Sequence, residues 1–256
     1  MGYAIIRCIA LLARRQFCAV FMEPAKNPMQ ENETSMGKVS ENGENAGRGR
    51  LIALEGIDGS GKSTQAAYLC ERLEKEGICC YRTMEPTDSP IGALIRKILR
   101  GEMKTDNRVI AGLFVADRLD HLLNAADGIA AKVEAGMTVV SDRYYFSSYA
   151  YNSVDMPMDW VIKANEPSSE ILRPALNVFI DIEPDAALER IAKNRVRQEL
   201  FETKARLELV RDNYRKAFRL LEEKERCVII DGNRPEEEIA ENVWEAVRDC
   251  IFEDSK

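Results

Sequence analysis

Five runs of mostly apolar residues recur along the chain, and stretches in which apolar residues have helical spacing separate them. Strands without polar alternation are buried on both faces, and helices between successive strands are typical of parallel sheets. The pattern therefore predicts an α/β domain in which helices cover both faces of a parallel sheet. The runs begin near Leu51, Ile78, Met137, Asn177 and Cys227.

The helical stretches have recognisable starts and stops. Ser89 and Pro90 suit the N-cap and first position of a helix that is expected to run to about Arg100. From Val109 to Val133 the apolar residues keep a helical period, with a predicted break near 127–128. Further helices are predicted before Gly77 and over Pro184–Arg195, Phe201–Lys224 and Glu236–Phe252.

The first part of the chain has a different character. Residues 1–22 are apolar, but three arginines interrupt them too often for a membrane span. The segment is interpreted as a dispensable extension or an early start, with a cleaved organellar segment as the alternative. Residues 23–50 are rich in Glu, Asn and Gly, as in disordered leaders. We therefore expect a disordered N-terminal extension over 1–49 and one folded domain over 50–256.

Composition narrows the possible partners. A net charge of -7 argues against general binding to nucleic acid or to a membrane surface. Seven cysteines without a C-x-x-C pair suggest neither a disulfide framework nor a zinc site, so most of them are expected to be core residues in a reducing, cytoplasmic compartment. The single histidine, His121, is predicted to be a solvated helix residue. The presence of only one histidine in the sequence argues against histidine-dependent hydrolysis.

A glycine-rich turn follows the first apolar run. From Gly56 to Ser63 the chain matches G-x-x-x-x-G-K-[ST], in which backbone N–H groups converge on phosphate oxygens. In this pattern Lys62 carries a positive charge to the β- and γ-phosphates, and the Ser63 hydroxyl is placed to bind Mg²⁺. The predicted ATP-binding residues are Gly56, Ile57, Asp58, Gly59, Ser60, Gly61, Lys62, Ser63 and Thr64.

Four segments occur along the chain in a fixed order, namely Glu55–Gln65, Glu85-Pro86-Thr87, Leu113–Arg118, and Asp142-Arg143-Tyr144 with Ser147–Tyr151. Together they resemble the thymidylate kinase family over essentially all of residues 50–256. The resemblance implies a P-loop NTPase fold with a five-stranded parallel sheet and helices on both faces, usually as a homodimer. It also implies transfer of the γ-phosphoryl group of ATP to dTMP with Mg²⁺, which gives dTDP and ADP for dTTP biosynthesis.

The resemblance assigns roles to individual residues. Asp142, at a strand end, would join Ser63 at the metal, with an N-cap as its alternative role. Phe114 would stack on the thymine, although a helical Phe is more often core. The implied catalytic residues are Lys62, Asp142, Arg143 and two lid arginines, Arg195 and Arg197, and the implied dTMP-binding residues are Asp58, Phe114, Arg118, Arg143, Ser148 and Tyr151.

One departure from the family bears on the acceptor site. Met84 stands where the family usually has an arginine that meets the acceptor phosphate. Arg82, two residues earlier on the same strand, or Arg96 on the next helix could replace it. Another nucleoside monophosphate kinase, for example one for UMP, and a catalytically silent nucleotide-binding protein are the alternative functions.

Overall fold

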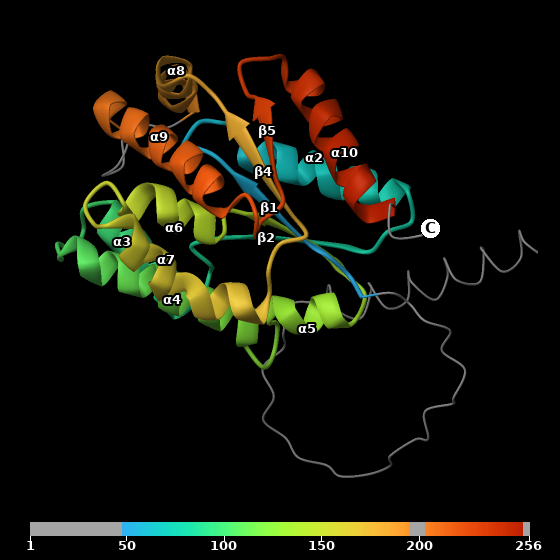
Figure 1. Ribbon diagram of the computed structural model, residues 1–256, viewed down its shortest axis with the longest axis horizontal. Coiled ribbons are helices and arrows are strands. Elements are labelled where there is room, and N and C mark those ends of the chain that lie inside the picture. The colour runs from blue at the N-terminus through green and yellow to red at the C-terminus, as the bar shows by residue number, and fades with distance from the viewer. Residues whose placement is uncertain (1–47, 195–202, 253–256) are drawn as a thin grey trace, which may run out of the picture. The chain divides into compact units, whose positions relative to one another are not determined.

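The computed structural model describes residues 48–194 and 203–252. Five parallel strands form one sheet in the order β2-β3-β1-β4-β5 (Figure 1). The predicted α/β fold and its parallel sheet are confirmed. The strands are β1 (Leu51–Glu55), β2 (Cys80–Met84), β3 (Thr138–Asp142), β4 (Leu176–Asp181) and β5 (Cys227–Asp231).

Helices cover both faces of the sheet (Figure 1). Among the described residues, no helix is both long enough and apolar enough to cross a membrane. The helices are α2 (Lys62–Lys75), α3 (Pro90–Leu99), α4 (Asn107–Leu123), α5 (Ile129–Glu134), α6 (Tyr145–Asn152), α7 (Met158–Ile171), α8 (Pro184–Asn194), α9 (Lys204–Leu221) and α10 (Glu236–Phe252).

Strand β1 explains how the two faces of the sheet are filled. Leu51 and Ala53 belong to one buried cluster, with residues of α4, α6, α7 and α9. Ile52 and Leu54 belong to a second cluster, with residues of α2 and α10. Successive side chains of a strand point to opposite faces, so an unbroken apolar run fills both layers.

Most predicted helix ends agree with the structure. Helix α3 begins at Pro90, and the Ser89 hydroxyl accepts a hydrogen bond from the Gly92 N–H at 3.1 Å. The long apolar stripe is divided as predicted, because α4 ends at Leu123 and α5 begins at Ile129. Helices α6 and α7 were not predicted. Nearly every residue of α6 is buried, so its sequence shows no amphipathic period.

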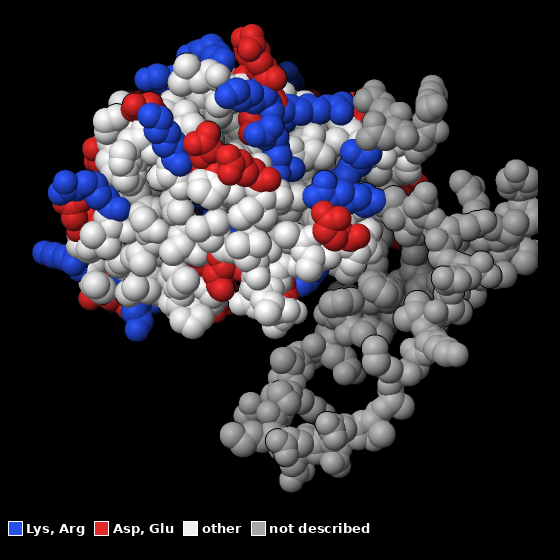
Figure 2. Space-filling model, turned by 60° about the horizontal axis from the view of Figure 1, so that its bottom comes forward, with Lys and Arg blue, Asp and Glu red and all other residues white. Residues whose placement is uncertain are grey.

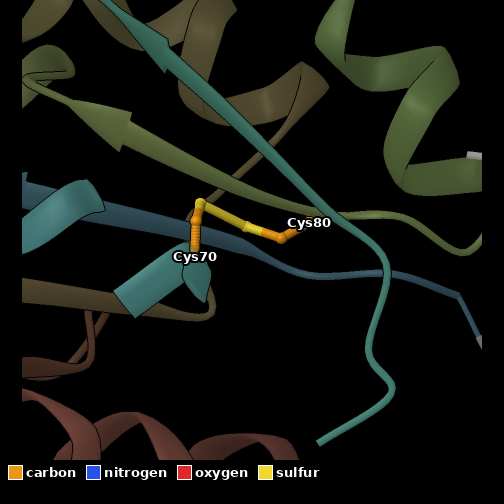
Figure 3. Close-up of a disulfide and its surroundings, with 2 residues drawn as sticks. All are labelled: Cys70 and Cys80. Carbon is orange, nitrogen blue, oxygen red and sulfur yellow. A yellow bond between two sulfur atoms is a disulfide. The ribbon is translucent and has the colours of Figure 1, made fainter. Parts of the chain in front are cut away.

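One expectation about the cysteines is wrong. Cys70 on α2 and Cys80 on β2 form a disulfide, with their Cα atoms 5.6 Å apart (Figure 3). Both residues also belong to the buried core, as expected. The pairing depends on how α2 packs beside β2, which residue spacing does not reveal.

Candidate active site

A cavity of about 640 Å³ lies at the carboxyl ends of β1, β2 and β3. β1 lies between β3 and β4, so the sheet order reverses there, and ligands of open α/β sheets bind at such a point. Gly56 and Ile57 lie outside the lining, and Arg195 and Arg197 lie outside the described residues. The predicted residues that line the cavity are Asp58, Gly59, Ser60, Gly61, Lys62, Ser63, Thr64, Phe114, Arg118, Asp142, Arg143, Ser148 and Tyr151.

The glycine-rich turn packs closely against helix α8. Gly59 has a φ of 80°, and a Cβ at this position would lie 2.4 Å from the carbonyl oxygen of Ala187. Only glycine fits such a backbone without strain. Helix α2 follows this turn directly and begins at Lys62, without a side chain that caps its N-terminus. The first N–H groups of α2 are therefore left for an anion.

Lys62 and its surroundings form the cationic end of this turn. The Lys62 ammonium donates to the carbonyl oxygen of Ile57 at 2.9 Å and lies 3.4 Å from the Ser60 hydroxyl. Burial, together with the positive charge of Arg143, lowers the pKa of Lys62 to about 8. A phosphate group beside the ammonium would favour its charged form.

Ser63 and Asp142 meet across the ends of α2 and β3. The Ser63 hydroxyl donates to Asp142 Oδ2. Asp142 Oδ1 is buried and has no hydrogen-bond partner within the described part of the chain. Hydroxyl and carboxylate oxygens are the ligands that Mg²⁺ accepts, and it usually takes one or two carboxylates together with substrate phosphates. This pair of residues therefore fits the ion.

Arg143 is held between the turn and helix α6. Its backbone has a φ of 75°, which is unusual for a residue other than glycine and costs about 1–3 kcal/mol. Its Nη2 donates to Asp58 Oδ1, its Nη1 donates to Ser147 Oγ at 3.1 Å, and its guanidinium lies 4.9 Å from the Tyr151 ring centroid. The Tyr151 hydroxyl donates to Asp58 Oδ2 at 3.0 Å. Asp58, Arg143 and Tyr151 thus form one unit.

Arg118 is buried at the other end of the cavity. An arginine has five N–H donors, and all of them face acceptors here. Nε and Nη2 approach Glu85 Oε2 at 2.9 and 2.6 Å, and Nη2 also donates to the carbonyl oxygen of Tyr144 at 3.1 Å. Nη1 donates to Ser148 Oγ at 3.1 Å and to Asn165 Oδ1. A ligand would have to take over one of these donors.

Asp117, next to Arg118, anchors the segment that follows β2. Its carboxylate accepts hydrogen bonds from the Thr87 N–H at 2.8 Å, the Thr87 hydroxyl at 2.5 Å and the Ser89 hydroxyl at 3.0 Å. Two of the sequence segments that resemble the family are thus tied together in space. Phe114, one turn before Arg118 on α4, also lines the cavity and is partly exposed to it.

The expectation that His121 is solvated is wrong. Its side chain is 8% exposed, and its Nε2 lies 2.7 Å from Thr83 Oγ1. Its Nδ1 lies 3.1 Å from Glu85 Oε1. His121 shares the face of α4 that carries Arg118, and Glu85 is buried between the two side chains.

Met84, which stands where the family usually has an arginine, lies at the edge of the cavity. Its side chain is 54% exposed at the cavity wall. Of the two arginines that could replace the missing one, Arg96 lines the cavity, whereas Arg82 is exposed and lies outside the lining. Arg96 Nη1 donates to the backbone carbonyl oxygens of Pro86 at 3.0 Å and Thr87 at 2.6 Å.

No role was predicted from the sequence for four polar residues around the site. Glu85 and Asn165 hold Arg118, while Glu55 and Tyr214 lie behind Arg143. For Glu55 a signal was present, because a carboxylate at the end of an apolar strand must find partners when it is buried. Asn165 and Tyr214 lie on helices far along the chain, and nothing local marks them.

Comparison with known proteins agrees with this site. The family model described as thymidylate kinase matches residues 54–243. The thymidylate kinase of Leptospira borgpetersenii is 34% identical over 195 residues, which cover 76% of this chain and 91% of that protein. An Aeropyrum pernix protein with a provisional thymidylate kinase name is 39% identical over 211 residues, covering 77% of this chain and 97% of its own. The chain belongs to the thymidylate kinase family.

Proposed function

We propose that the chain is a dTMP kinase, which transfers the γ-phosphoryl group of ATP to dTMP and releases dTDP and ADP. One observation carries the proposal. A single cavity has a phosphate-binding turn at one end, Phe114 and Arg118 at the other, and Arg143 between them. This arrangement suits two nucleotides that meet end to end at their phosphates. Family membership supports the same reaction.

The donor end of the cavity supplies position and charge. Phosphoryl transfer asks little covalent chemistry of a protein, which must align two phosphates, exclude water and offset charge on the equatorial oxygens. Lys62 and the free N–H groups of α2 would hold the ATP phosphates. Arg143, held at both of its terminal nitrogens, would contact the transferred group and the acceptor phosphate.

Ser63 and Asp142 would hold Mg²⁺ through their side-chain oxygens. The ion, when bound, neutralises charge on the donor phosphate oxygens. The orphaned Oδ1 of Asp142 supports this assignment. Arg195 and Arg197, which lie outside the described residues, stay predicted as a further source of positive charge over ATP.

The acceptor end offers a ring and several directed polar groups. Phe114 would stack on thymine, and the Arg118–Ser148 pair would meet the base edge, because the Ser148 hydroxyl can turn and release an Arg118 donor. Tyr151 and Asp58 would lie beside the deoxyribose and the acceptor phosphate. Arg96 would replace the arginine missing at Met84, since its guanidinium lines the cavity.

We also propose a homodimer that forms through α4. Val109 and Leu123 are 49% and 60% exposed, and Leu113 and Ala116, on the same stripe, are partly exposed. Figure 2, which brings the lower side of Figure 1 forward, shows a broad area of uncharged side chains. The exposed apolar side chains of this stripe are typical of an interaction surface. The kinase would occupy residues 50–256, with 1–49 outside it, and a cytoplasmic location remains a prediction.

A release assay for ADP, run on the full chain with ATP, Mg²⁺ and a series of monophosphates, tests the proposal. We expect dTMP to give the highest kcat/KM, with dUMP and UMP well below it. Equal or higher kcat/KM with UMP would point to another monophosphate kinase. ATP binding without ADP release in the presence of any acceptor would instead identify a silent nucleotide-binding protein.

A further inference from the structure

Glu55 is a buried carboxylate at the end of β1, directly before the glycine-rich turn. Its Oε1 accepts a hydrogen bond from the backbone N–H of Tyr144 at 2.9 Å. Its Oε2 lies 2.6 Å from the Ser147 hydroxyl and 3.0 Å from the Tyr214 hydroxyl. These partners come from the N-terminal end of α6 and from α9. A buried carboxylate is costly unless it is well hydrogen-bonded, and here both oxygens are occupied.

Ser147 links this carboxylate to Arg143. Arg143 Nη1 donates to Ser147 Oγ at 3.1 Å, and the Tyr214 hydroxyl lies 2.8 Å from the same oxygen. A serine hydroxyl donates one hydrogen and accepts two. With an ionised Glu55, Ser147 donates to Glu55 Oε2 and accepts from Arg143, while the single hydrogen of the Tyr214 hydroxyl goes either to Ser147 Oγ or to Glu55 Oε2. An ionised Glu55 requires this direction, because it can only accept.

We propose that Glu55 is a positioning residue for phosphoryl transfer, and that it acts through Ser147 to hold the Arg143 guanidinium where donor and acceptor phosphates meet. The inference rests on the proposed function, which places Arg143 between the two nucleotides. Ser147 holds Nη1 of Arg143 and Asp58 holds Nη2. With both terminal nitrogens held, the guanidinium is oriented before substrate binds. The free-energy cost of orienting it is therefore not incurred during the reaction.

The protonation state of Glu55 decides the direction of these hydrogen bonds. Burial raises the pKa of Glu55 to about 7, against the opposing effects of Ser147 and Arg143. A protonated Oε2 that donates to Ser147 turns the Ser147 hydrogen towards Tyr214, and the Tyr214 hydrogen is then left for Oε2 at 3.0 Å or for the carbonyl oxygen of Gly56 at 3.3 Å. The charged and titratable groups that act on Glu55 or feel its charge are Arg143, Lys62, Arg118, Tyr144, Tyr149, Tyr214 and Cys227.

Glu55→Gln reproduces the reversed state. The Tyr144 backbone N–H cannot turn away, so the glutamine oxygen stays beside it and the NH₂ group faces Ser147 and Tyr214. Those hydroxyls must then reverse their hydrogen bonds. Glu225→Gln is the matched control. Glu225 is also a buried carboxylate, bonded to Tyr145 OH at 2.7 Å and to Asn177 Nδ2 at 3.3 Å, away from the cavity lining.

The experiment measures kcat and both KM values of the full chain with ATP and dTMP from pH 5.5 to 8.5. We expect Glu55→Gln to lower kcat about 10- to 100-fold at pH 8, because the neutral glutamine no longer attracts the Arg143 guanidinium and a small misplacement in such a site costs up to about 100-fold. The KM for ATP should change less than about twofold, since the glycine-rich turn is intact. Wild-type kcat should fall as the pH is lowered through Glu55 titration, and this fall should be absent in Glu55→Gln. Glu225→Gln should keep the wild-type profile.

An unchanged kcat in Glu55→Gln, or an equal loss of kcat in Glu225→Gln, would overturn the inference. Ser147→Ala serves if Glu55→Gln does not fold, because it removes the link and leaves the carboxylate. A lowered kcat in Ser147→Ala with an unchanged KM for ATP supports the proposal, and a wild-type kcat contradicts it. Wild-type protein that does not phosphorylate dTMP would defeat the proposed function itself, which separates the two failures.

Discussion

Lys62 shows how burial prepares a single side chain for an anion. Its hydrogen-bond partners are neutral, namely the carbonyl oxygen of Ile57 and the hydroxyl of Ser60. With Arg143 nearby, the ammonium is destabilised, and its pKa falls to about 8. A phosphate group would add a negative charge beside the ammonium, and such an interaction is stronger in a buried site than at the surface. The same interaction strengthens as charge develops in the transition state.

Lys62→Ala should therefore lower kcat about 100- to 1000-fold, as removal of other transition-state charge partners does. Steady-state assays with saturating ATP and dTMP measure this. Lys75→Ala removes an exposed lysine from the last turn of the same helix and is the control. A kcat for Lys62→Ala within about threefold of wild type would contradict the ATP-site assignment.

The raised pKa of Glu55 leads to a prediction about how the free energy of unfolding depends on pH. Its pKa is raised from 4.5 to about 7 in the folded protein, so between these values the folded state binds more protons than the unfolded state. Its contribution to the free energy of unfolding is therefore greatest below pH 4.5 and is lost as the pH rises to about 7. The difference over this window is about 3 kcal/mol.

Glu55→Gln lacks this titration. Relative to wild type, the variant should gain about 3 kcal/mol of unfolding free energy between pH 4.5 and pH 8. Urea unfolding of both proteins at several pH values measures the difference. Glu225→Gln provides a matched buried variant. A constant gap between wild type and Glu55→Gln across the pH range would show that Glu55 is not perturbed.

Secondary-structure elements differ in how far the sequence reveals them. The strands and most of the amphipathic helices were predicted, because an apolar run and a helix buried on one face each leave a pattern. Helix α6 leaves none, since it is buried nearly all round. Helix α7 was missed although it is buried on one face, and Pro167 within it weakens the helical signal. The position of the glycine-rich turn between β1 and α2 was predicted because its residues are contiguous. Glu85 and Asn165 were missed because their contacts with Arg118 join residues 33 and 47 positions apart.

Asp117 on α4 is predicted to position the segment that leads into α3. Its carboxylate holds Thr87 and Ser89 in front of α3, and α3 carries Arg96 to the cavity. Asp117→Asn places a donor NH₂ group among three donors. We expect a loss of about 1–3 kcal/mol in the free energy of unfolding. We also expect a higher KM for dTMP, with little change in the KM for ATP.

Urea unfolding and initial-rate kinetics measure the two effects of Asp117→Asn. Asp120→Asn, one turn later on α4, is the control because its carboxylate contacts Asn124 within the same helix region. Equal KM values for dTMP in Asp117→Asn and wild type would mean that the segment before α3 does not set acceptor binding.

At the scale of the whole molecule, the apolar residues of α4 fall into two groups. Leu122 belongs to the buried cluster that includes residues of α5, α6 and α7, whereas Val109 and Leu123 lie outward with Leu113 and Ala116 between them. The same helix carries Phe114 and Arg118 to the cavity. A partner seated on the outer stripe would therefore brace the helix that binds the acceptor. In a dimer of this kind, dimer formation and acceptor binding would be coupled.

Val109→Glu combined with Leu123→Glu should convert the protein to a monomer, because it buries two carboxylates in the proposed interface. Sedimentation velocity gives the mass, and the KM for dTMP should rise in the monomer while the KM for ATP stays close to wild type. Leu209→Glu with Leu220→Glu is the matched control, since both leucines are exposed on α9, at 53% and 58%. If the α4 variant keeps the wild-type mass, or the control variant loses it, the interface does not lie on α4.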